Sequence, residues 1–249
     1  MGKMQDYRVY HFKKTEYLFY FVEGTLLTAC IAWLFYKSLW GMLFGIVFIP
    51  FYLKKKKREL CEKRKQRLCV EFKECLQSVS AALGAGYSIE NAWKEAEKDL
   101  RKLLGEDGMM VEELRMMNRQ IAVNVPIEEL LRQFATRSGI EDVESFCQVF
   151  QFAKRGGGDL RKIIQNFTSR ISEKVEITRE IDTIMAAKKL EQKIMAVMPI
   201  FILLYVGLSS PEFLEGIYHN AFGVLLMSGC LLVYGGAVLL AQKIVGIQV

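Results

Sequence analysis

The fold of this chain is decided by the stretch Phe150–Ile164, FQFAKRGGGDLRKII, in which glycines join two amphipathic helices. Gly157 and Gly158 supply the backbone freedom that a left-handed helix end requires. Asp159 stands where its carboxylate can accept hydrogen bonds from the free N–H groups of the next helix. The stretch therefore predicts a helical hairpin with a glycine hinge.

A similar unit occurs earlier in the chain, at Val79–Trp93, VSAALGAGYSIENAW. An offset of 71 residues lays Gly86 on Gly157 and Ser88 on Asp159, and it keeps apolar positions of both helices in register. Glycine followed by a capping residue occurs at most corners between helices, so either copy alone would say little. The register shared over about 15 positions indicates an internal duplication into two related helical hairpin units.

Apolar residues make up 51% of the 249-residue chain and are concentrated toward its two ends. Two of the apolar stretches, Leu39–Leu53 and Ile194–Leu208, hold only fifteen residues each. Fifteen helical residues reach about 23 Å, which is less than the hydrocarbon core of about 30 Å. Flanking residues such as Lys37 and Lys193 can make up the difference, and buried core helices are the alternative. The first stretch has no small-residue cleavage site after it, so we expect it to stay in the mature protein. The four candidate membrane spans are Tyr17–Tyr36, Leu39–Leu53, Ile194–Leu208 and Ala221–Ala241.

The basic run Lys54–Arg67, KKKKRELCEKRKQR, holds nine Lys or Arg against two Glu and directly follows the second candidate span. The positive-inside rule places this run in the cytoplasm, where it can meet anionic membrane lipids. Counting spans then puts residues 1–16 and 242–249 in the cytoplasm and the loop with Glu212 and Glu215 outside. A nucleic-acid patch is the alternative, but topology accounts for the run, so we expect no nucleic-acid partner.

Between the paired spans, residues 68–193 carry a helical apolar period throughout. We therefore expect an all-α membrane protein, with a six-helix cytoplasmic bundle flanked by two transmembrane helices on each side. The expected domains are residues 1–16 (cytoplasmic segment), 17–53 (transmembrane hairpin), 54–67 (basic linker), 68–193 (cytoplasmic bundle), 194–241 (transmembrane hairpin) and 242–249 (cytoplasmic tail). The expected bundle helices are Leu60–Leu83, Ser88–Leu103, Met109–Ile121, Pro126–Arg137, Glu141–Arg155 and a long helix from Asp159 that continues into the third span.

The candidate spans contain three unusual features. Pro199 removes a helix hydrogen bond, so it either kinks the third span or is simply tolerated there. Gly41 and Gly45 form a G-x-x-x-G face suited to close helix packing. Glu23 is the one charged residue of the first span, so it should pair, become protonated or face a protein partner. Reaching back to the cytoplasmic surface is its alternative, and we treat Glu23 as a candidate partner contact.

Catalytic and metal-binding signatures are missing from the sequence. It contains no Walker-type loop, no G-x-S-x-G, no H-E-x-x-H and no kinase motif, and its six cysteines form no CxxC pair. The only histidines are His11 and His219. The acidic pairs Glu112–Glu113 and Glu128–Glu129 read as solvated faces near helix starts. We therefore expect no catalytic residue, no cofactor, no metal and no enzymatic activity.

Four short motifs mark the corners of the helical region and the third span: Gly86–Ile89 (GYSI), Asn124–Ile127 (NVPI), Gly157–Leu160 (GGDL) and Met198–Pro199. The spacing of these four motifs resembles the F-domain family of type II secretion and type IV pilus systems. The resemblance covers residues 68–199, and a single module between two pairs of spans is similar to the tight-adherence (Tad/Flp) pilus inner-membrane platform proteins. Where small residues would be expected before the third span, this chain has Lys188–Glu191, KKLE.

The resemblance implies a multi-pass platform protein in the inner cell membrane, which forms an oligomer. Its implied partners are a cytoplasmic secretion ATPase, a paralogous platform protein and prepilin subunits. The basic residues beside the second hinge, Arg155, Arg161 and Lys162, are candidate contacts for an acidic partner surface, and a solvated helix end is the alternative for each. A multi-pass sensor or scaffold that signals through the helical domain is the other function we consider. A transporter is less favoured, because the spans offer little for a substrate site.

Overall fold

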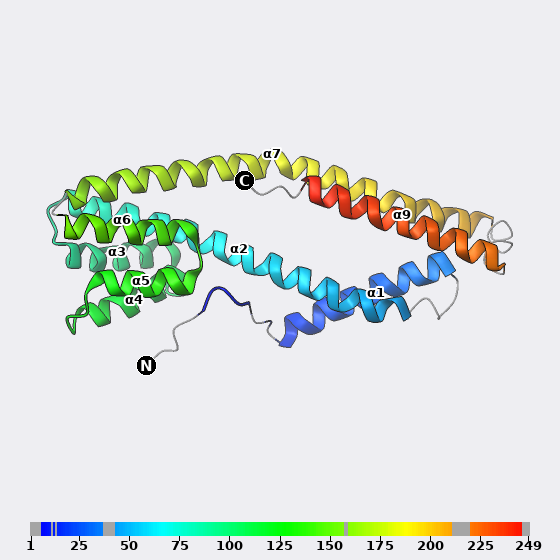
Figure 1. Cartoon of the computed structure of the whole chain (residues 1–249), viewed down its shortest axis with the longest axis horizontal. Helices are drawn as coiled ribbons and strands as arrows, with labels where there is room; N and C mark the ends of the chain where they lie inside the picture. The colour runs from blue at the N-terminus through cyan, green and yellow to red at the C-terminus, as the bar shows by residue number, and fades with distance from the viewer. Residues whose placement is uncertain are drawn as a thin grey trace. The chain divides into compact units, whose positions relative to one another are not determined.

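The computed structural model describes residues 6–10, 12, 14–36, 43–156, 159–210 and 220–245, and every regular element among them is an α-helix (Figure 1). The expectation of an all-α protein is confirmed for these residues. The helices are α1 (Lys14–Tyr36), α2 (Leu43–Gly84), α3 (Ile89–Leu104), α4 (Met109–Ile121), α5 (Ile127–Ser138), α6 (Glu141–Arg155), α7 (Leu160–Ser209) and α9 (Ala221–Val245).

The short helices of the middle region lie where the sequence predicts them. α4 and α6 have the expected limits. α3, α5 and α7 begin one residue later than expected, because the expected first residues Ser88, Pro126 and Asp159 occupy the position just before each helix. The chain turns where it contains residues that accept a left-handed backbone. Gly139 ends α5 with φ of 58°, and Asn124 follows α4 with φ of 64°, a conformation that asparagine tolerates better than most residues.

Two helices are much longer than the others. α2 begins at Leu43, so the basic juxtamembrane run Lys54–Arg67 and the expected bundle helix Leu60–Leu83 belong to one continuous helix. Lysine and arginine are good helix formers, and neither glycine nor proline interrupts this run. α7 is one helix from Leu160 to Ser209, so the expected long last helix is confirmed. The helix continues through Pro199, which agrees with both expectations for this proline, a kink or simple tolerance.

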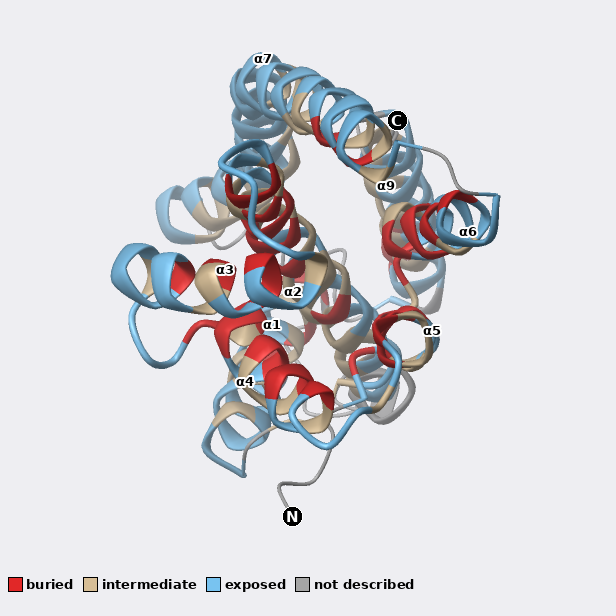
Figure 2. Ribbon diagram, turned by 90° about the vertical axis from the view of Figure 1, so that its left-hand side faces the viewer, coloured by how far each residue is buried: buried red, intermediate tan, exposed pale blue. Residues whose placement is uncertain are grey.

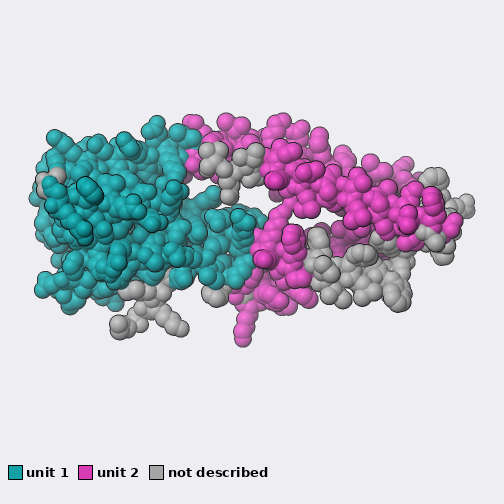
Figure 3. Space-filling view, in the orientation of Figure 1, with its two compact units in different colours: residues 1–11, 57–177 teal, residues 12–56, 178–249 magenta. Residues whose placement is uncertain are grey.

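The chain divides into two compact units, which Figure 3 shows in different colours. Unit 1 comprises residues 1–11 and 57–177, and unit 2 comprises residues 12–56 and 178–249. The expected domain limits, after residues 16, 53, 67, 193 and 241, stay predictions. The chain is helical at two of the limits between the units. α2 passes through the limit at residues 56–57 and α7 through the limit at residues 177–178, each without a helix break.

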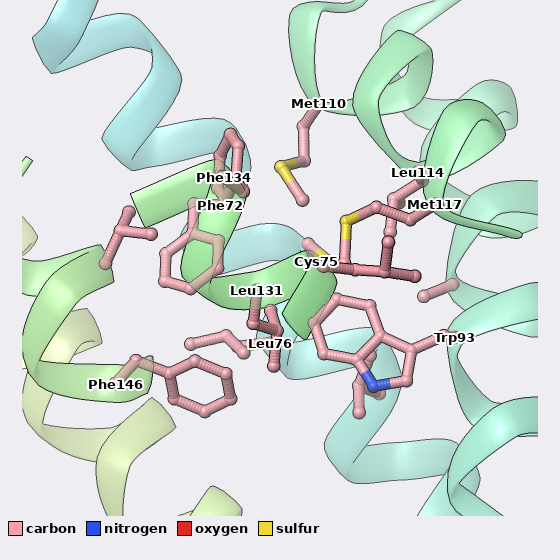
Figure 4. Close-up of a cluster of buried hydrophobic side chains, with 14 of the residues drawn as sticks. Phe72, Cys75, Leu76, Trp93, Met110, Leu114, Met117, Leu131, Phe134 and Phe146 are labelled. Carbon is pink, nitrogen blue, oxygen red and sulfur yellow. The ribbon is translucent and has the colours of Figure 1, made fainter. Parts of the chain in front are cut away.

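Unit 1 contains a hydrophobic core to which α2 through α7 contribute and to which the N-terminal segment adds Tyr7. Figure 2 marks the buried residues of these helices in red. Near the centre, the Phe72 ring lies 6.0 Å from the Phe134 ring and 5.6 Å from the Phe146 ring, between centroids (Figure 4). Burying each such side chain stabilises the fold by about 1.5–3 kcal/mol relative to exposing it.

The pattern of burial supports the internal duplication. The offset of 71 residues pairs buried residues of α2 and α3 with buried residues of α6 and α7. Both copies therefore bury the same helix faces in the same register, as two related hairpins require. The pairs are Phe72 with Val143, Cys75 with Phe146, Leu76 with Cys147, Val79 with Phe150, Ala82 with Ala153, Trp93 with Ile164, and Leu100 with Ile171.

Unit 2 is built from apolar helices. Three helices of the described part are long and apolar enough to cross a membrane: α1 over Lys14–Phe35, α7 within Leu160–Ser209, and α9 over Phe222–Ile244. The expected span Leu39–Leu53 lies partly outside the described residues. A small cluster joins α1, α7 and α9, with Leu34, Phe35 and Met227 buried against the partly buried Ile31, Ile200, Leu203, Leu204 and Leu231.

Candidate functional site

The first hinge ends α2 in the left-handed conformation that its glycine predicts. Gly86 has φ of 90°, the Gly86 N–H donates to the Leu83 carbonyl over 3.1 Å, and the Tyr87 N–H donates to the Ala82 carbonyl over 3.1 Å. This pair of bonds is the Schellman arrangement of a helix end. The Ser88 hydroxyl accepts the Asn91 N–H at 3.4 Å. The predicted cap residues of the first hinge are confirmed.

The second hinge has the same capping chemistry on its α7 side. A carboxylate oxygen of Asp159 accepts the Lys162 N–H at 3.3 Å, as predicted. On the α6 side, the Gly156 N–H donates to the Phe152 carbonyl over 2.9 Å. Gly157 and Gly158 lie outside the described residues, so their left-handed backbone stays a prediction. Movement about either hinge also stays a prediction.

The residues around the second hinge combine basic and apolar side chains. Arg155, Arg161 and Lys162 are exposed, as expected, and Lys162 makes only a loose ion pair with Asp159, 3.8 Å between Nζ and Oδ2. Phe152, in the last turn of α6, is 84% exposed. A single exposed apolar side chain is common on protein surfaces, so Phe152 is of interest here only because exposed basic residues lie beside it. Sequence reasoning missed it, although Phe152 falls off the stripe that Phe146 and Phe150 define, which is a readable signal.

The first turns of α7 are fixed to the core of unit 1. Ile164 and Ile171 are buried, and the Gln77 side-chain amide of α2 donates to the Ser172 hydroxyl of α7 at 3.3 Å. Lys174 of α7 pairs with Asp142 of α6, 2.7 Å between Nζ and Oδ1. α7 is thus bonded to two other helices before it leaves the core.

Asp142 also approaches a thiol. The Cys69 sulfur lies 3.7 Å from the second oxygen of Asp142. Burial, and then the neighbouring carboxylate, raise the pKa of Cys69 to about 11, so its thiol is protonated at neutral pH. Such a thiol is a poor nucleophile and serves here as a packing residue.

A buried ion pair joins α4 to α5. The guanidinium of Arg137 donates two hydrogen bonds to the carboxylate of Glu113, at 2.9 Å and 2.7 Å. The side chains are 18% and 0% exposed, respectively. The expectation that Glu113 belongs to a solvated face is therefore wrong. Its place between Met110 and Met117, on the apolar stripe of α4, is the signal that could have revealed its burial.

A second buried carboxylate caps α4. The α4 N-terminus has no side-chain cap of its own, because Gly108 occupies the capping position. Glu71 of α2 supplies the acceptor instead: its Oε2 takes the Met110 N–H at 2.9 Å, and its Oε1 takes Arg67 Nε at 3.0 Å. A carboxylate at a helix N-terminus is favoured by the helix dipole. Glu71 thus ties α4 to α2.

The N-terminal segment Asp6–Tyr10, which we call the N-terminal strap, inserts Tyr7 into unit 1. The Tyr7 side chain is buried, its hydroxyl donates to Glu113 over 3.1 Å, and its N–H donates to the Arg137 carbonyl over 3.0 Å. The Arg64 guanidinium of α2 lies over the Tyr7 ring, 4.7 Å from its centroid. Burial, and then the charge of Glu113, raise the pKa of Tyr7 well above its ordinary range. Sequence reasoning did not find this contact.

Glu23, the candidate partner contact of the first span, is half-buried in α1. Its neighbour Gly24 is buried, and a Cβ atom there would lie 3.4 Å from the Tyr52 ring of α2, so α1 and α2 approach each other at this glycine. Of the two glycines expected to form a packing face, Gly41 and Gly45, Gly41 lies outside the described residues. The side-chain surroundings of Gly45 are outside them as well.

The described residues hold no group of three His, Cys, Asp or Glu side chains that could bind a metal ion, and all six cysteines are free. Over its described part, the chain is an all-helical protein with three helices long and apolar enough to span a membrane. Comparison with known proteins finds no match: no family model, no curated protein and no solved structure matches this chain.

Proposed function

We propose that this protein is an inner-membrane platform of a Tad/Flp-type pilus or a related type II secretion machine, which couples a cytoplasmic secretion ATPase to pilin assembly. One observation carries the proposal: α7 begins at the second hinge, contributes to the core of unit 1, and continues to Ser209 without a helix break. Its last part is apolar enough to cross a membrane. A movement imposed on unit 1 would therefore reach the span through a hydrogen-bonded backbone.

The contact between Tyr7 and Glu113 supports a topology with two spans before unit 1. Because the Tyr7 hydroxyl is bonded to Glu113, the N-terminal strap and unit 1 share one side of any membrane. An even number of spans must then separate them. α1 is one candidate, and the apolar stretch Leu39–Leu53 is the natural second. The basic run Lys54–Arg67 favours the cytoplasm as the shared side.

The second hinge is the proposed contact of the ATPase. Phe152 can anchor a partner, since aromatic side chains, phenylalanine included, are enriched in the buried core of protein interfaces. Arg155, Arg161 and Lys162 favour an acidic partner and would speed its association. The spans, with Glu23 as one contact, are the proposed site for prepilin subunits and for a paralogous platform protein in a larger oligomer.

The test softens α7 without changing its length. Arg179, Glu180, Asp182 and Thr183 are exposed residues of α7, and they are replaced together by glycine in one variant and by alanine in another. The two variants lose similar side-chain groups. Glycine, however, costs about 1 kcal/mol per residue in helix stability relative to alanine. Filament assembly is measured in the native host, together with membrane insertion and co-purification of the secretion ATPase.

We expect the alanine variant to assemble filaments and the glycine variant to lose them, with insertion and ATPase recruitment kept in both. Normal filament levels in the glycine variant would refute transmission through α7. A host that keeps its filaments after deletion of the whole gene would refute the platform function itself. In that case a sensor or scaffold, the alternative function, becomes the better explanation of the helical unit.

A further inference from the structure

The strap is held by a site that three helices of unit 1 build for one tyrosine. Arg64 of α2 covers the ring, Glu113 of α4 accepts the hydroxyl, and the Arg137 carbonyl of α5 accepts the backbone N–H of Tyr7. Glu113 is fully buried, so its position is fixed by the bonds it accepts from Arg137. The site therefore offers a cation for the ring and a carboxylate for the hydroxyl, a combination that matches tyrosine better than phenylalanine.

Tyr7 is the one buried side chain among the strap residues Asp6–Tyr10. Asp6, Arg8 and Val9 are exposed, and Tyr10 is half-buried. The backbone contacts on either side of Tyr7 come from groups near the surface, such as the Arg64 guanidinium, which donates to the Asp6 carbonyl over 3.1 Å. A segment with one buried side chain can leave its site while the helices beneath stay folded, because such local opening needs far less free energy than global unfolding.

A native cysteine lies directly beneath the strap. The Cys61 thiol approaches the carbonyl oxygens of Tyr7 and Arg8 at 3.5 Å and 3.4 Å. Cys61 is buried, yet it is not part of the hydrophobic core cluster of unit 1. Because the strap lies directly against this thiol, we expect the reactivity of Cys61 to report whether the strap is bound.

We propose that the groove formed by α2, α4 and α5 is a tyrosine-binding docking surface whose occupant is the chain's own N-terminal strap, and that the strap is a releasable tether. Residues 11–13 connect the strap to α1, so docking ties the start of the first candidate span to unit 1. Release would free unit 1 from this tie while its connections through α2 and α7 persist. The proposal rests on the contacts of Tyr7 and does not depend on the pilus function.

The experiment measures maleimide labelling of the full-length protein in detergent, with each cysteine read separately by peptide mass spectrometry. Cys75 is fully buried in the hydrophobic core of unit 1, so its labelling reports unfolding of unit 1. The test variant is Tyr7→Ala. The matched control is Val9→Ala, which truncates an exposed side chain of the same strap.

We expect Tyr7→Ala to raise the labelling rate of Cys61 at least tenfold, the fold-change that corresponds to about 1.4 kcal/mol, with Cys75 unchanged. Val9→Ala should leave both rates as they are. Equal Cys61 rates in the wild type and in Tyr7→Ala would overturn the proposal, because the strap would then not be the cover. A parallel rise at Cys75 would also overturn it, since Tyr7 would then hold the fold and not a releasable segment.

A concentration series identifies the occupant. If each strap docks on its own chain, the Cys61 rate in the wild type is independent of protein concentration. A rate that falls as the concentration rises would mean that straps are exchanged between two copies, and the intramolecular tether would be wrong.

Discussion

Replacing Arg137 with alanine is expected to destabilise unit 1 by about 3–5 kcal/mol, which is the usual result of removing one partner of a buried ion pair. The structure gives the reason. Glu113 is fully buried and accepts two hydrogen bonds from Arg137. In the Arg137→Ala variant the buried carboxylate loses both of these bonds and its paired charge, and keeps the hydrogen bond from the Tyr7 hydroxyl. Such a loss is a large fraction of the stability of an ordinary domain.

The matched variant removes every member of the network at once. Glu113→Leu and Arg137→Met replace the pair by apolar side chains of similar size, and Tyr7→Phe removes the hydroxyl that would otherwise be buried without an acceptor. Replacing a buried pair in this way is often neutral or stabilising. We therefore expect the triple variant to lie within about 1–2 kcal/mol of the wild type, the remaining loss reflecting the hydrogen bond of the strap.

The assay uses Trp93, which is fully buried in unit 1. With Trp33 and Trp40 replaced by phenylalanine, its fluorescence during denaturant unfolding reports unit 1 alone. The free energy of unfolding is compared between the wild type, Arg137→Ala and the triple variant. A loss below about 1 kcal/mol in Arg137→Ala, typical of an exposed pair, would refute the reasoning. So would a triple variant as unstable as the single one.

Three further outcomes are expected. Cysteines placed at Glu176 and Ser210, in a background without the native cysteines, should label from opposite sides of the membrane in intact cells; labelling of position 176 from outside would make the proposed topology wrong. Gly86→Val should destabilise unit 1 by about 1–3 kcal/mol, because a β-branched residue is strained at positive φ. The control Gly84→Ala, inside α2 with open space around it, should be neutral or stabilising. Equal melting temperatures of the two variants would count against this reasoning. The raised pKa of Tyr7 means that its neutral form is favoured when docked, so this stabilisation is complete below the ordinary tyrosine value of 10.0 and is lost as the pH rises above it. Tyr7→Phe should lack that alkaline loss in denaturation experiments, and an identical pH profile would contradict the assignment.

The sequence predicts the helices of unit 1 well because each corner contains a residue with a local reason to end a helix. Gly86, Asn124 and Gly139 adopt the left-handed backbone that their residue types allow. Ser88 and Asp159 cap the helices that follow them. These effects act over a few residues, so one sequence is enough to find them.

Contacts between distant segments are less readable. The strap is too short to show a periodicity, and its binding site exists only after three helices, far apart in sequence, have packed together. Glu113 was misread because an adjacent acidic pair is usually solvated, and only its partner Arg137, on another helix, makes burial acceptable. The start of α2 at Leu43 was missed for a different reason: a change from apolar to basic residues marks a change of solvent and not a helix end.

The internal duplication predicted from the sequence also accounts for the length of α7. In the first copy, the chain turns at Gly105–Gly108, GEDG, and α4 folds back onto α3. The offset of 71 residues lays this turn on Glu176–Arg179, EITR, which contains no glycine, and there α7 simply continues. Loss of one turn is thus enough to convert a closed hairpin into an exit toward the membrane. Conversely, placing GEDG at residues 176–179 would offer the second copy the return path that the first one takes.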